Sequence, residues 1–450
     1  MLYPLIVNDI VKATGGKLIC GNGSAVIKAV STDSRTLTAE TLFIPIKGEK
    51  FDGHDFLGGA TIAITERDVE PAEGKTFIRT GNTIEAFGAI ARFYKEKYPV
   101  PTISVVGSVG KTTTRDMIAS VMSQKYKTLK TEKNYNNNIG VPIMVMKLEE
   151  EHEAAVLELG MSALGEIEYL ADIVRPDTLV MTNIGMSHIE NLGSQENIFK
   201  AKMEGTKYLT SENVVIANFD DEFLKTVGDY GDYKVISYGV DNKWDVTGIN
   251  IKDLGFNGCE FDILFENNTY HVHLNIPGVH NVYNALAAFA AGYVHGLLPE
   301  EIVRGLESAG FTAMRMEIKE CDGLTIINDC YNASPSSVEA ALNVLKTENK
   351  GRKVAVLGDI FELGDFAPEA HRNIGMLAKE IADVIVCVGD NAAYIKEGAE
   401  GVEQIYYINS TDKAENEITH IINSGDTILL KASRGMHFEK LFKKLTEGQK

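Results

Sequence analysis

The sequence is short of cysteine, tryptophan and proline for its length. Its 450 residues include five cysteines, one tryptophan and 11 prolines. The cysteines are odd in number, widely spaced and without a CxxC pair, which excludes a disulfide framework and a zinc ribbon as working hypotheses. So little proline argues against a disordered scaffold. We therefore expect reduced thiols in a cytoplasmic protein that buries sizeable cores.

Long apolar runs are also missing. No stretch approaches the ~20 apolar residues of a membrane helix. The N-terminal segment 1–16 carries Asp9 early and has no basic residues ahead of an apolar stretch, unlike a secretory signal. We expect neither a targeting peptide nor a membrane span.

Basic residues are outnumbered by acidic ones. Lysine and arginine total 44 against 63 aspartates and glutamates, which gives a formal net charge of -19. A general DNA or RNA binder usually presents a basic face, so we expect no nucleic-acid partner. A polyanionic small molecule stays possible, because a local glycine-rich loop or a metal ion can hold phosphates whatever the overall charge.

The length predicts about three domains at roughly 150 residues each. From residue 102 onward, short β-branched runs alternate with helical periodicity, as in a nucleotide-binding α/β core. The expected buried parallel strands are 102–106, 154–159, 178–184 and 214–217. Residues 233–275 look antiparallel, and 284–291 look like a buried helix.

A second alternating series begins near residue 315 and predicts a separate doubly wound sheet. Its expected strands are 324–328, 353–357, 384–388, 405–408 and 427–430. The predicted fold class is therefore α/β with three domains: a mixed α+β N-terminal domain (1–98), a central P-loop-type α/β domain (99–311) and a C-terminal Rossmann-like α/β domain (312–450).

The strongest local motif directly follows the first central strand and opens a helix. It consists of Gly107, Ser108, Val109, Gly110, Lys111, Thr112 and Thr113. Glycines let backbone N–H groups surround phosphate oxygens, Lys111 reaches the terminal phosphates, and Thr112 can ligate Mg²⁺. The usual GxxxxGK[ST] spacing would place glycine where Val105 stands, so the loop is shortened.

A GTPase is the first alternative that this loop raises. Residues 242–245 read NKWD, which matches the guanine-reading pattern, but no DxxG lies between Lys111 and Asn242. The loop spacing is also wrong for that class. We interpret NKWD as a polar turn.

Two further side chains follow the ends of predicted parallel strands. Glu158 ends one strand and His188 follows the next, at the carboxyl edge where open α/β sheets place their ligands. A carboxylate there can hold a hard cation. Without other evidence, Glu158 can equally be an ordinary strand-end acid, and a lone histidine such as His188 is more often a structural loop residue.

Taken together, motifs along the whole chain resemble the Mur ligases, which are ATP-dependent amide-bond-forming enzymes of cell-wall precursor synthesis. The segments that carry the resemblance, besides the phosphate loop, are 31–35, 42–48, 51–56, 131–142, 183–194, 201–205, 280–288, 356–364 and 431–436. The resemblance implies a three-substrate ligase that uses ATP and Mg²⁺.

The resemblance also implies where the muramoyl substrate binds. Ser34, Arg35, Lys47, Asp52 and His54 would lie near the uridine diphosphate or the muramoyl-peptide. Arg35 supplies a planar fork that suits a phosphate or carboxylate. An asparagine-rich loop would contact the polar peptide and sugar through Asn134, Asn136, Asn137 and Asn138.

The implied metal and catalytic site combines Lys111, Thr112, Glu158, His188 and Lys202. Thr112, Glu158 and His188 would help to bind Mg²⁺, and Lys202 would carry a CO₂-derived carbamate. Carbamylation turns a cation that repels Mg²⁺ into an anion that can ligate it. Without the resemblance, Lys202 reads as a solvated helix lysine.

The remaining implied residues serve the nucleotide and the incoming amine. Asn281 and Asn284 would contact adenine, while Arg315 and Asp329 would contact the phosphate and ribose. Glu362, Ser433 and Arg434 would contribute to the site for the incoming amino acid or dipeptide. Two positions depart from the family pattern: Met314 stands where glycine is common, and Ser334 where asparagine is common.

Within the family, the loop 136–142, the segment 189–194 and the tail 431–435 favour the member that joins D-Ala-D-Ala to UDP-N-acetylmuramoyl-tripeptide through an acyl phosphate. These two molecules are the expected partners, and we expect a monomer. The alternatives are a sister ligase that adds a diamino acid, a folylpolyglutamate synthase-like ligase and, more remotely, a P-loop regulatory NTPase.

Overall fold

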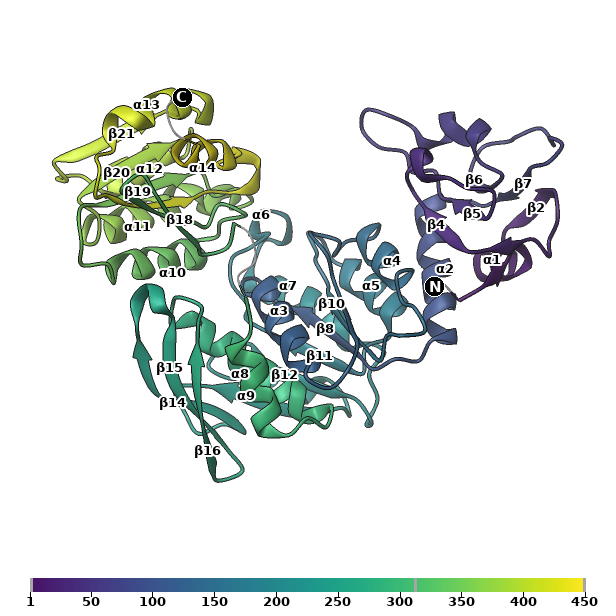
Figure 1. Cartoon of the computed structure of the whole chain (residues 1–450), viewed down its shortest axis with the longest axis horizontal. Helices are drawn as coiled ribbons and strands as arrows, with labels where there is room; N and C mark the ends of the chain where they lie inside the picture. The colour runs from purple at the N-terminus through teal and green to yellow at the C-terminus, as the bar shows by residue number, and fades with distance from the viewer. Residues whose placement is uncertain (1–2, 311–313, 448–450) are drawn as a thin grey trace.

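The protein consists of three lobes in a row, each built around its own β-sheet (Figure 1). The computed structural model describes residues 3–310 and 314–447. The predicted three-domain α/β class is confirmed. Each large sheet falls within one predicted domain, but the boundaries themselves stay predictions, and residues 311 and 312 lie outside the described residues.

The N-terminal lobe holds a five-stranded sheet in the order β2-β7-β6-β5-β4, parallel except for β2 against β7. Its strands are β2 (Lys17–Cys20), β4 (Ala29–Ser31), β5 (Thr41–Phe43), β6 (Ile62–Thr65) and β7 (Thr76–Arg79), and β1 (Leu5–Ile6) pairs separately with β3 (Val26–Ile27). Helix α1 spans Val7–Thr14 and helix α2 spans Thr83–Lys97.

Helix α2 joins the N-terminal lobe to the central one. The side chain of Asn82 caps it by accepting hydrogen bonds from the backbone N–H groups of Ile84 and Glu85. Its buried face packs against α4 (Gly140–Val145) and α5 (Glu166–Val174), and Tyr94 Oη donates to the Leu148 carbonyl at 2.5 Å. The first lobe is thus anchored to the second along a helix.

The central sheet has nine strands in the order β16-β15-β14-β13-β12-β11-β8-β10-β9. They are β8 (Thr102–Val106), β9 (Thr128–Lys130), β10 (Ala154–Glu158), β11 (Thr178–Met181), β12 (Val214–Asn218), β13 (Lys234–Gly239), β14 (Val246–Asp253), β15 (Cys259–Phe265) and β16 (Asn268–Leu274). Strands β8, β10, β11 and β12 are buried along their whole length, because helices cover both faces.

The expectation of an antiparallel region at 233–275 is only partly right. Strands β14, β15 and β16 are antiparallel, but β13 pairs in parallel with β12 and with the start of β14. The crossover from β12 to β13 contains the 3₁₀ helix Leu224–Tyr230 and no α-helix. It therefore lacks the 3.6-residue periodicity that announces a parallel connection.

Two groups of helices cover the central sheet. One face carries α3 (Lys111–Met122), α8 (His280–Val294) and α9 (Pro299–Glu307), which contact one another. The other face carries α4, α5 and α7 (Gln195–Met203), and the short α6 (Ile189–Leu192) precedes α7. The buried helix expected at 284–291 lies within α8.

The C-terminal sheet has six strands in the order β17-β18-β22-β19-β20-β21. The strands are β17 (Glu317–Cys321), β18 (Leu324–Asn328), β19 (Lys353–Gly358), β20 (Val384–Val388), β21 (Gln404–Ile408) and β22 (Thr427–Lys431); the helices are α10 (Pro335–Lys346), α11 (Ala367–Lys379), α12 (Ala392–Gly398), α13 (Thr411–Ile421) and α14 (Glu439–Thr446). The five predicted strands are all present. The additional edge strand β17 is antiparallel and rich in charge, as edge strands often are.

All five cysteines are free thiols. No helix within residues 3–310 and 314–447 has the length and apolar character needed to cross a membrane.

Candidate functional site

The phosphate loop lies where β8 ends and α3 begins, in the strand-loop-helix context expected from the sequence. Gly107 and Gly110 both have positive φ angles, 154° and 84°. A Cβ atom on Gly107 would lie 1.8 Å from Thr182 Oγ1, so only glycine fits there. Lys111 Nζ donates to the carbonyls of Gly107 at 2.8 Å and Ser108 at 3.2 Å, which folds this side chain over the loop.

Burial is the main influence on the Lys111 ammonium. Desolvation lowers the pKa of Lys111, and the nearby carboxylate of Glu158 opposes that shift. A lysine held in this way lies close to the loop backbone and can turn outward to meet phosphate oxygens.

Glu158, at the end of β10, bonds two other predicted site residues. Its carboxylate accepts hydrogen bonds from Thr112 Oγ1 at 2.8 Å and from Asn136 Nδ2 at 2.8 Å. Arg115 Nη1 lies 3.4 Å away. The side chain is 6% exposed, so this carboxylate is buried beside the first turn of α3.

His188 meets the C-terminal lobe. It precedes α6 with a φ of 66°, and its Nδ1 lies 2.5 Å from Glu362 Oε2. The contact with His188 lowers the pKa of the Glu362 carboxyl. A backbone hydrogen bond from Glu190 N to Glu362 O, 3.1 Å long, joins the same two segments. Glu362 thus contacts the central lobe and borders the proposed metal site.

Lys202 is buried, in contrast to the solvated lysine that its helix position alone suggests. It lies on α7 and is 2% exposed. Burial, followed by repulsion from Lys111, lowers the pKa of Lys202 well below its usual value. This shift favours the unprotonated amine, which is the form that reacts with CO₂.

The donor atoms near Glu158 fit Mg²⁺ in part. The Thr112 hydroxyl and the Glu158 carboxylate are hard oxygen ligands of the kind that Mg²⁺ prefers. A protonated Lys202 would repel the ion, whereas a carbamylated one would add another oxygen ligand. Within the described residues, no group of three or more His, Cys, Asp or Glu side chains is placed to hold a metal.

The asparagines at the start of α8 lie beside the phosphate loop. Asn284 Oδ1 accepts from Thr114 Oγ1 at 2.9 Å, and Asn284 Nδ2 donates to Asn281 Oδ1 at 2.8 Å. A Cβ atom on Gly110 would lie 2.7 Å from Asn284 Oδ1. The predicted adenine-contacting residues are therefore close to the predicted phosphate loop.

Across from them, the C-terminal lobe supplies Arg315 and Asp329. The Arg315 guanidinium stacks on the Tyr331 ring at 4.3 Å, and its buried Nε has no hydrogen-bond partner among the described residues. Asp329 Oδ2 forms a buried ion pair with Lys431 Nζ at 2.5 Å. A small cavity of about 80 Å³ is lined by Gly110, Asn281, Arg315, Asp329 and Lys431.

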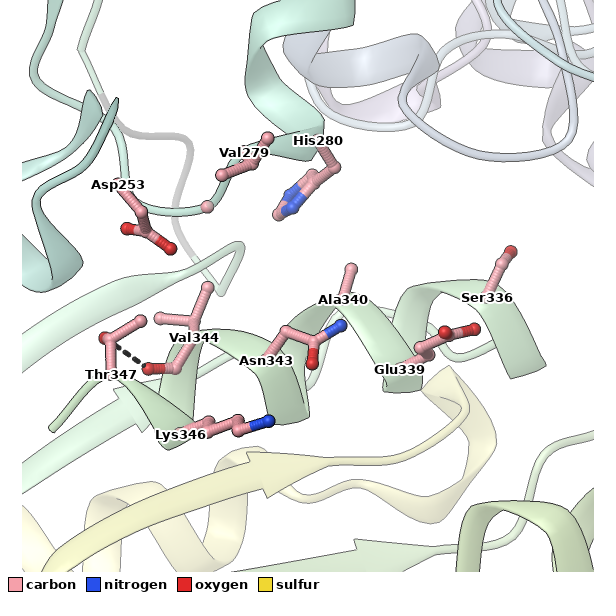
Figure 2. A pocket seen from close by; sticks show the side chains of 11 residues that line it. Asp253, Val279, His280, Ser336, Glu339, Ala340, Asn343, Val344, Lys346 and Thr347 are labelled. Atoms are coloured by element: carbon pink, nitrogen blue, oxygen red, sulfur yellow. Dashed lines mark hydrogen bonds between the residues drawn. The ribbon is translucent and has the colours of Figure 1, made fainter. Parts of the chain in front are cut away.

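A larger cavity of about 580 Å³ continues from that point, between the start of α8 and helix α10 (Figure 2). His280 and Val279 project into it from the central lobe, while Ser336, Ala340 and Asn343 line it from α10. Burial lowers the pKa of His280 to about 4. The cavity between the two lobes has apolar walls at Val279 and Ala340 and polar walls at Ser336 and Asn343.

The main cleft, of about 770 Å³, has walls from all three lobes. The N-terminal lobe contributes Asn82 and Glu85 from the start of α2. The central lobe contributes Lys111, Asn134, Asn136, Asn137, Asn138, Glu158 and His188, and the C-terminal lobe contributes Arg315, Tyr331, Asn332 and Arg434.

The asparagine loop divides into anchoring and exposed members. Asn136 bonds Glu158, and Asn137 Oδ1 accepts from Gly140 N at 2.8 Å, which begins α4. Asn134 and Asn138 are exposed in the cleft. Two of the four predicted substrate contacts therefore also shape the loop itself.

The predicted site residues of the N-terminal lobe differ in how far their side chains are exposed and bonded. His54 is buried, its Nδ1 lies 2.7 Å from Asp52 Oδ1, and Arg67 bonds the other oxygen of Asp52. The backbone N–H of His54, which donates to Asp52 Oδ1 at 2.9 Å, is the main cause that lowers the pKa of Asp52, and the two side-chain contacts add to it. Together these contacts fold the turn 52–59. Arg35 and Lys47 are exposed, and Ser34 is half-buried.

In the C-terminal lobe, Ser433 is buried and structural in its contacts. Its Oγ accepts from Phe361 N at 2.8 Å, next to Glu362. Arg434 is half exposed, lies 3.3 Å from Glu439 and faces the main cleft.

Sequence reasoning missed two residues that the structure places at the site. Asn183 bonds both backbone groups of Val109, and Lys431 pairs with Asp329. Asn183 lies next to the last residue of the predicted strand 178–184, so its position near the carboxyl edge was the available signal. Lys431 directly follows the predicted strand 427–430.

Two family models match the central and C-terminal lobes. Residues 105–292 match the Mur ligase middle domain, and residues 314–434 match the Mur ligase, glutamate ligase domain. The UDP-N-acetylmuramoyl-tripeptide–D-alanyl-D-alanine ligase of Bacillus subtilis is 39% identical over 435 residues, 94% of each chain.

Solved structures agree over nearly the whole length. A crystal structure of MurF from Acinetobacter baumannii shares 32% identity with a TM-score of 0.92, covering 99% of this chain and 100% of that one. MurF from Thermotoga maritima in complex with ADP shares 25% identity with a TM-score of 0.83, covering 93% and 96%. This chain belongs to the Mur ligase family, in the group of the UDP-N-acetylmuramoyl-tripeptide–D-alanyl-D-alanine ligases.

Proposed function

We propose that this protein is the ATP-dependent ligase that joins D-Ala-D-Ala to UDP-N-acetylmuramoyl-tripeptide in peptidoglycan precursor synthesis. The observation that carries the proposal is the cleft of about 770 Å³ lined by all three lobes. A reaction of three substrates needs such a meeting place, with the phosphate loop, the metal ligands and an arginine-bearing wall around one volume.

The nucleotide lies across the central and C-terminal lobes in this proposal. The backbone of residues 107–113 and Lys111 hold the phosphates, and Arg315 adds positive charge from the opposite side. Asp329 holds the ribose, while Asn281 and Asn284 contact the base. The cavity beside His280 offers room for the remainder of the base (Figure 2).

The reaction proceeds in two steps at one place. A carboxylate oxygen of the tripeptide attacks the γ-phosphate of ATP, and ADP leaves as Lys111 and Arg315 offset the developing charge. The free amine of D-Ala-D-Ala then attacks the acyl phosphate carbon, phosphate leaves, and an amide forms as the amine gives up a proton. Activation is needed because a carboxylate is a poor electrophile.

Mg²⁺ would be held by Thr112, Glu158, His188 and a carbamylated Lys202, and it supplies positive charge to the phosphate oxygens. The buried amine of Lys202, whose pKa is well below its usual value, supports the carbamate, since CO₂ adds only to an unprotonated amine.

The other two substrates approach from opposite lobes. Ser34, Arg35, Lys47, Asp52 and His54 serve the uridine diphosphate end. Among them, Lys47 and Arg35 are exposed, and Arg35 pairs with Asp33 at 2.7 Å, a contact that it exchanges for a phosphate. Asp52 with His54 shapes the turn 52–59. The asparagines 134, 136, 137 and 138 receive the sugar and peptide.

The dipeptide enters on the C-terminal side, where Arg434 offers a fork for its carboxylate. Ser433 and Glu362 position this wall, Ser433 through the Phe361 backbone and Glu362 through His188. We further propose that the protein works as a monomer in the cytoplasm, where these soluble precursors and ATP are available.

The decisive experiment measures phosphate release from ATP in the presence of UDP-N-acetylmuramoyl-tripeptide, with and without D-Ala-D-Ala. Phosphate release that depends on the dipeptide, together with the amide product in a mass spectrum, supports the proposal. Equal turnover with glutamate, lysine or diaminopimelate in place of the dipeptide would point to a sister ligase instead.

A further inference from the structure

The phosphate loop has little internal structure to hold its shape. Two of its four residues before α3 are glycines with positive φ angles, and glycine is the most flexible residue of the backbone. A loop that receives phosphates must nevertheless present its N–H groups in fixed directions. The rigidity has to come from a neighbouring segment.

That segment is Thr182–Gly185, directly after β11. Its contacts run along the loop: Ser108 N donates to Asn183 O at 3.0 Å, Gly185 N donates to Ser108 Oγ at 2.8 Å, and Thr182 Oγ1 donates to Val109 O at 2.6 Å. Strand β11 neighbours β8 in the sheet, so the two segments leave the same edge side by side.

The side-chain amide of Asn183 makes the central contact. Its Oδ1 accepts from Val109 N at 2.9 Å, and its Nδ2 donates to Val109 O at 3.1 Å. Asparagine is suited to this task because one amide provides an acceptor and a donor side by side. Together with its own carbonyl, Asn183 makes three hydrogen bonds to two consecutive loop residues.

The segment that carries Asn183 is itself fixed from behind. Asn218 Nδ2 donates to Thr182 O at 3.2 Å, Ile184 N donates to Asp221 Oδ2 at 2.7 Å, and Gln195 Nε2 donates to Ile184 O at 3.0 Å. These partners come from the end of β12 and the start of α7. Asn183 is therefore a firm support for the loop.

The contacts of Asn183 determine which backbone N–H groups of the loop are left to bind phosphate. The N–H groups of Ser108 and Val109 are both occupied by Asn183. The first N–H groups of α3 have no partner within the helix. The shortened loop therefore directs the phosphates to residues 110–113, and Asn183 keeps the Val109 carbonyl turned away from them.

We propose that Asn183 is a positioning residue for the nucleotide, which sets the phosphate loop by holding both backbone groups of Val109. This inference rests on the proposed ATP-binding function and names a residue that serves it without touching the ligand. Without the amide, Val109 O keeps only the Thr182 hydroxyl as a side-chain donor, so it rotates more easily toward the phosphates and repels them.

The test is the affinity of the full chain for Mg·ADP, measured by calorimetry. Asn183→Ala removes two hydrogen bonds and should raise the Kd for ADP about tenfold to fiftyfold. Asn183→Asp keeps the acceptor but loses the donor and adds a charge beside the phosphates, so its Kd should rise at least as far. The Kd for UDP-N-acetylmuramoyl-tripeptide should change less than about twofold in both.

The matched control is Asn213→Ala. Asn213 Oδ1 also accepts two hydrogen bonds, from Thr210 N at 2.7 Å and Thr210 Oγ1 at 2.9 Å, but it precedes β12 at the opposite edge of the sheet. This variant should bind ADP like the parent chain. If Asn183→Ala does not fold, Thr182→Val replaces it in the test. This variant removes one hydrogen bond to Val109 O and should raise the Kd for ADP about threefold.

The possible results separate the two claims. If folded Asn183→Ala binds ADP with a Kd within twofold of the parent value, the role of Asn183 is overturned and the proposed function stands. The same holds for Thr182→Val if that variant is the one tested. An equal weakening of both ligands also overturns it, since that marks a general structural defect. A parent chain that binds no Mg·ADP overturns the proposed function, and the inference with it.

Discussion

The buried pair of Lys431 and Asp329 gives the sharpest prediction about stability. Lys431 Nζ lies 2.5 Å from Asp329 Oδ2 and 3.0 Å from the Asn332 carbonyl, and the two side chains are 4% and 10% exposed. Lys431→Met keeps the aliphatic part of the side chain and removes the charge. Asp329 then keeps one hydrogen bond, from Met316 N at 3.2 Å.

Breaking a buried ion pair on one side typically costs about 3–5 kcal/mol, since the remaining charge loses its partner in a medium that solvates it poorly. With a slope of about 2 kcal/mol per molar urea, the C-terminal lobe should unfold about 2 M earlier. That loss is a large part of the stability of an ordinary domain.

The single tryptophan makes this measurable lobe by lobe. Trp244 lies in the central lobe, just before β14, so its fluorescence reports that lobe, while circular dichroism reports the whole chain. Lys431→Met should shift an early part of the circular dichroism transition and leave the fluorescence transition in place. The comparison is Lys440→Met, which breaks the exposed 2.7 Å pair with Asp412 and should cost less than about 1 kcal/mol.

Equal effects of Lys431→Met and Lys440→Met would refute this reasoning, because burial is the only difference on which the prediction depends. The double variant Asp329→Leu with Lys431→Met should recover most of the lost stability, since neither charge is then left alone. It should still bind ADP poorly, because the proposed ribose contact is gone.

Three further predictions concern the site. Burial lowers the pKa of Lys202 well below its value in the unfolded chain, which costs stability at pH 7, so Lys202→Met should raise the free energy of unfolding in urea titrations at this pH. The same variant should lower dipeptide-dependent phosphate release about 100-fold or more, and a fully active variant would remove the carbamate. The pKa of His280 is about 4 in the folded chain, so the unfolded chain binds a proton first as the pH falls. The parent should therefore lose up to about 2 kcal/mol of stability between pH 6.5 and pH 4 in urea titrations, and His280→Gln should lose less over the same range. Glu362→Ala removes the side-chain contact with His188 between the central and C-terminal lobes. Hydrogen exchange at the Glu190 amide, which donates to Glu362 O, should then be about tenfold faster. An unchanged rate would mean that the Glu362 carboxylate does not hold the two lobes together.

The parts of the fold that could be predicted are those with a strong local pattern. The buried parallel strands read as continuous β-branched runs, and the phosphate loop combines glycines, a lysine and a helix start within seven residues. Such features are determined by neighbours in the sequence. The parallel placement of β13 is not, because its partner β12 is chosen by a crossover without helical periodicity.

The same distinction separates the site residues. Glu158 and His188 could be suggested because strand ends of a parallel sheet meet at one edge. The burial of Lys202 and the pairing of Lys431 with Asp329 depend on segments about a hundred residues apart, which no local pattern records. Asp52 and Asn137 show the converse: side chains suited to a ligand in type also fold their own turns.

The three-lobed cleft also bears on how long a ligand stays bound. None of the lobes alone encloses the volume that contains Lys111, Asn82 and Arg434. A product or inhibitor held by all three can leave only when at least one lobe moves away, so its residence time follows the rate of interdomain opening and not only the strength of its contacts. Compounds that bridge two lobes should therefore dissociate slowly even where each half binds weakly.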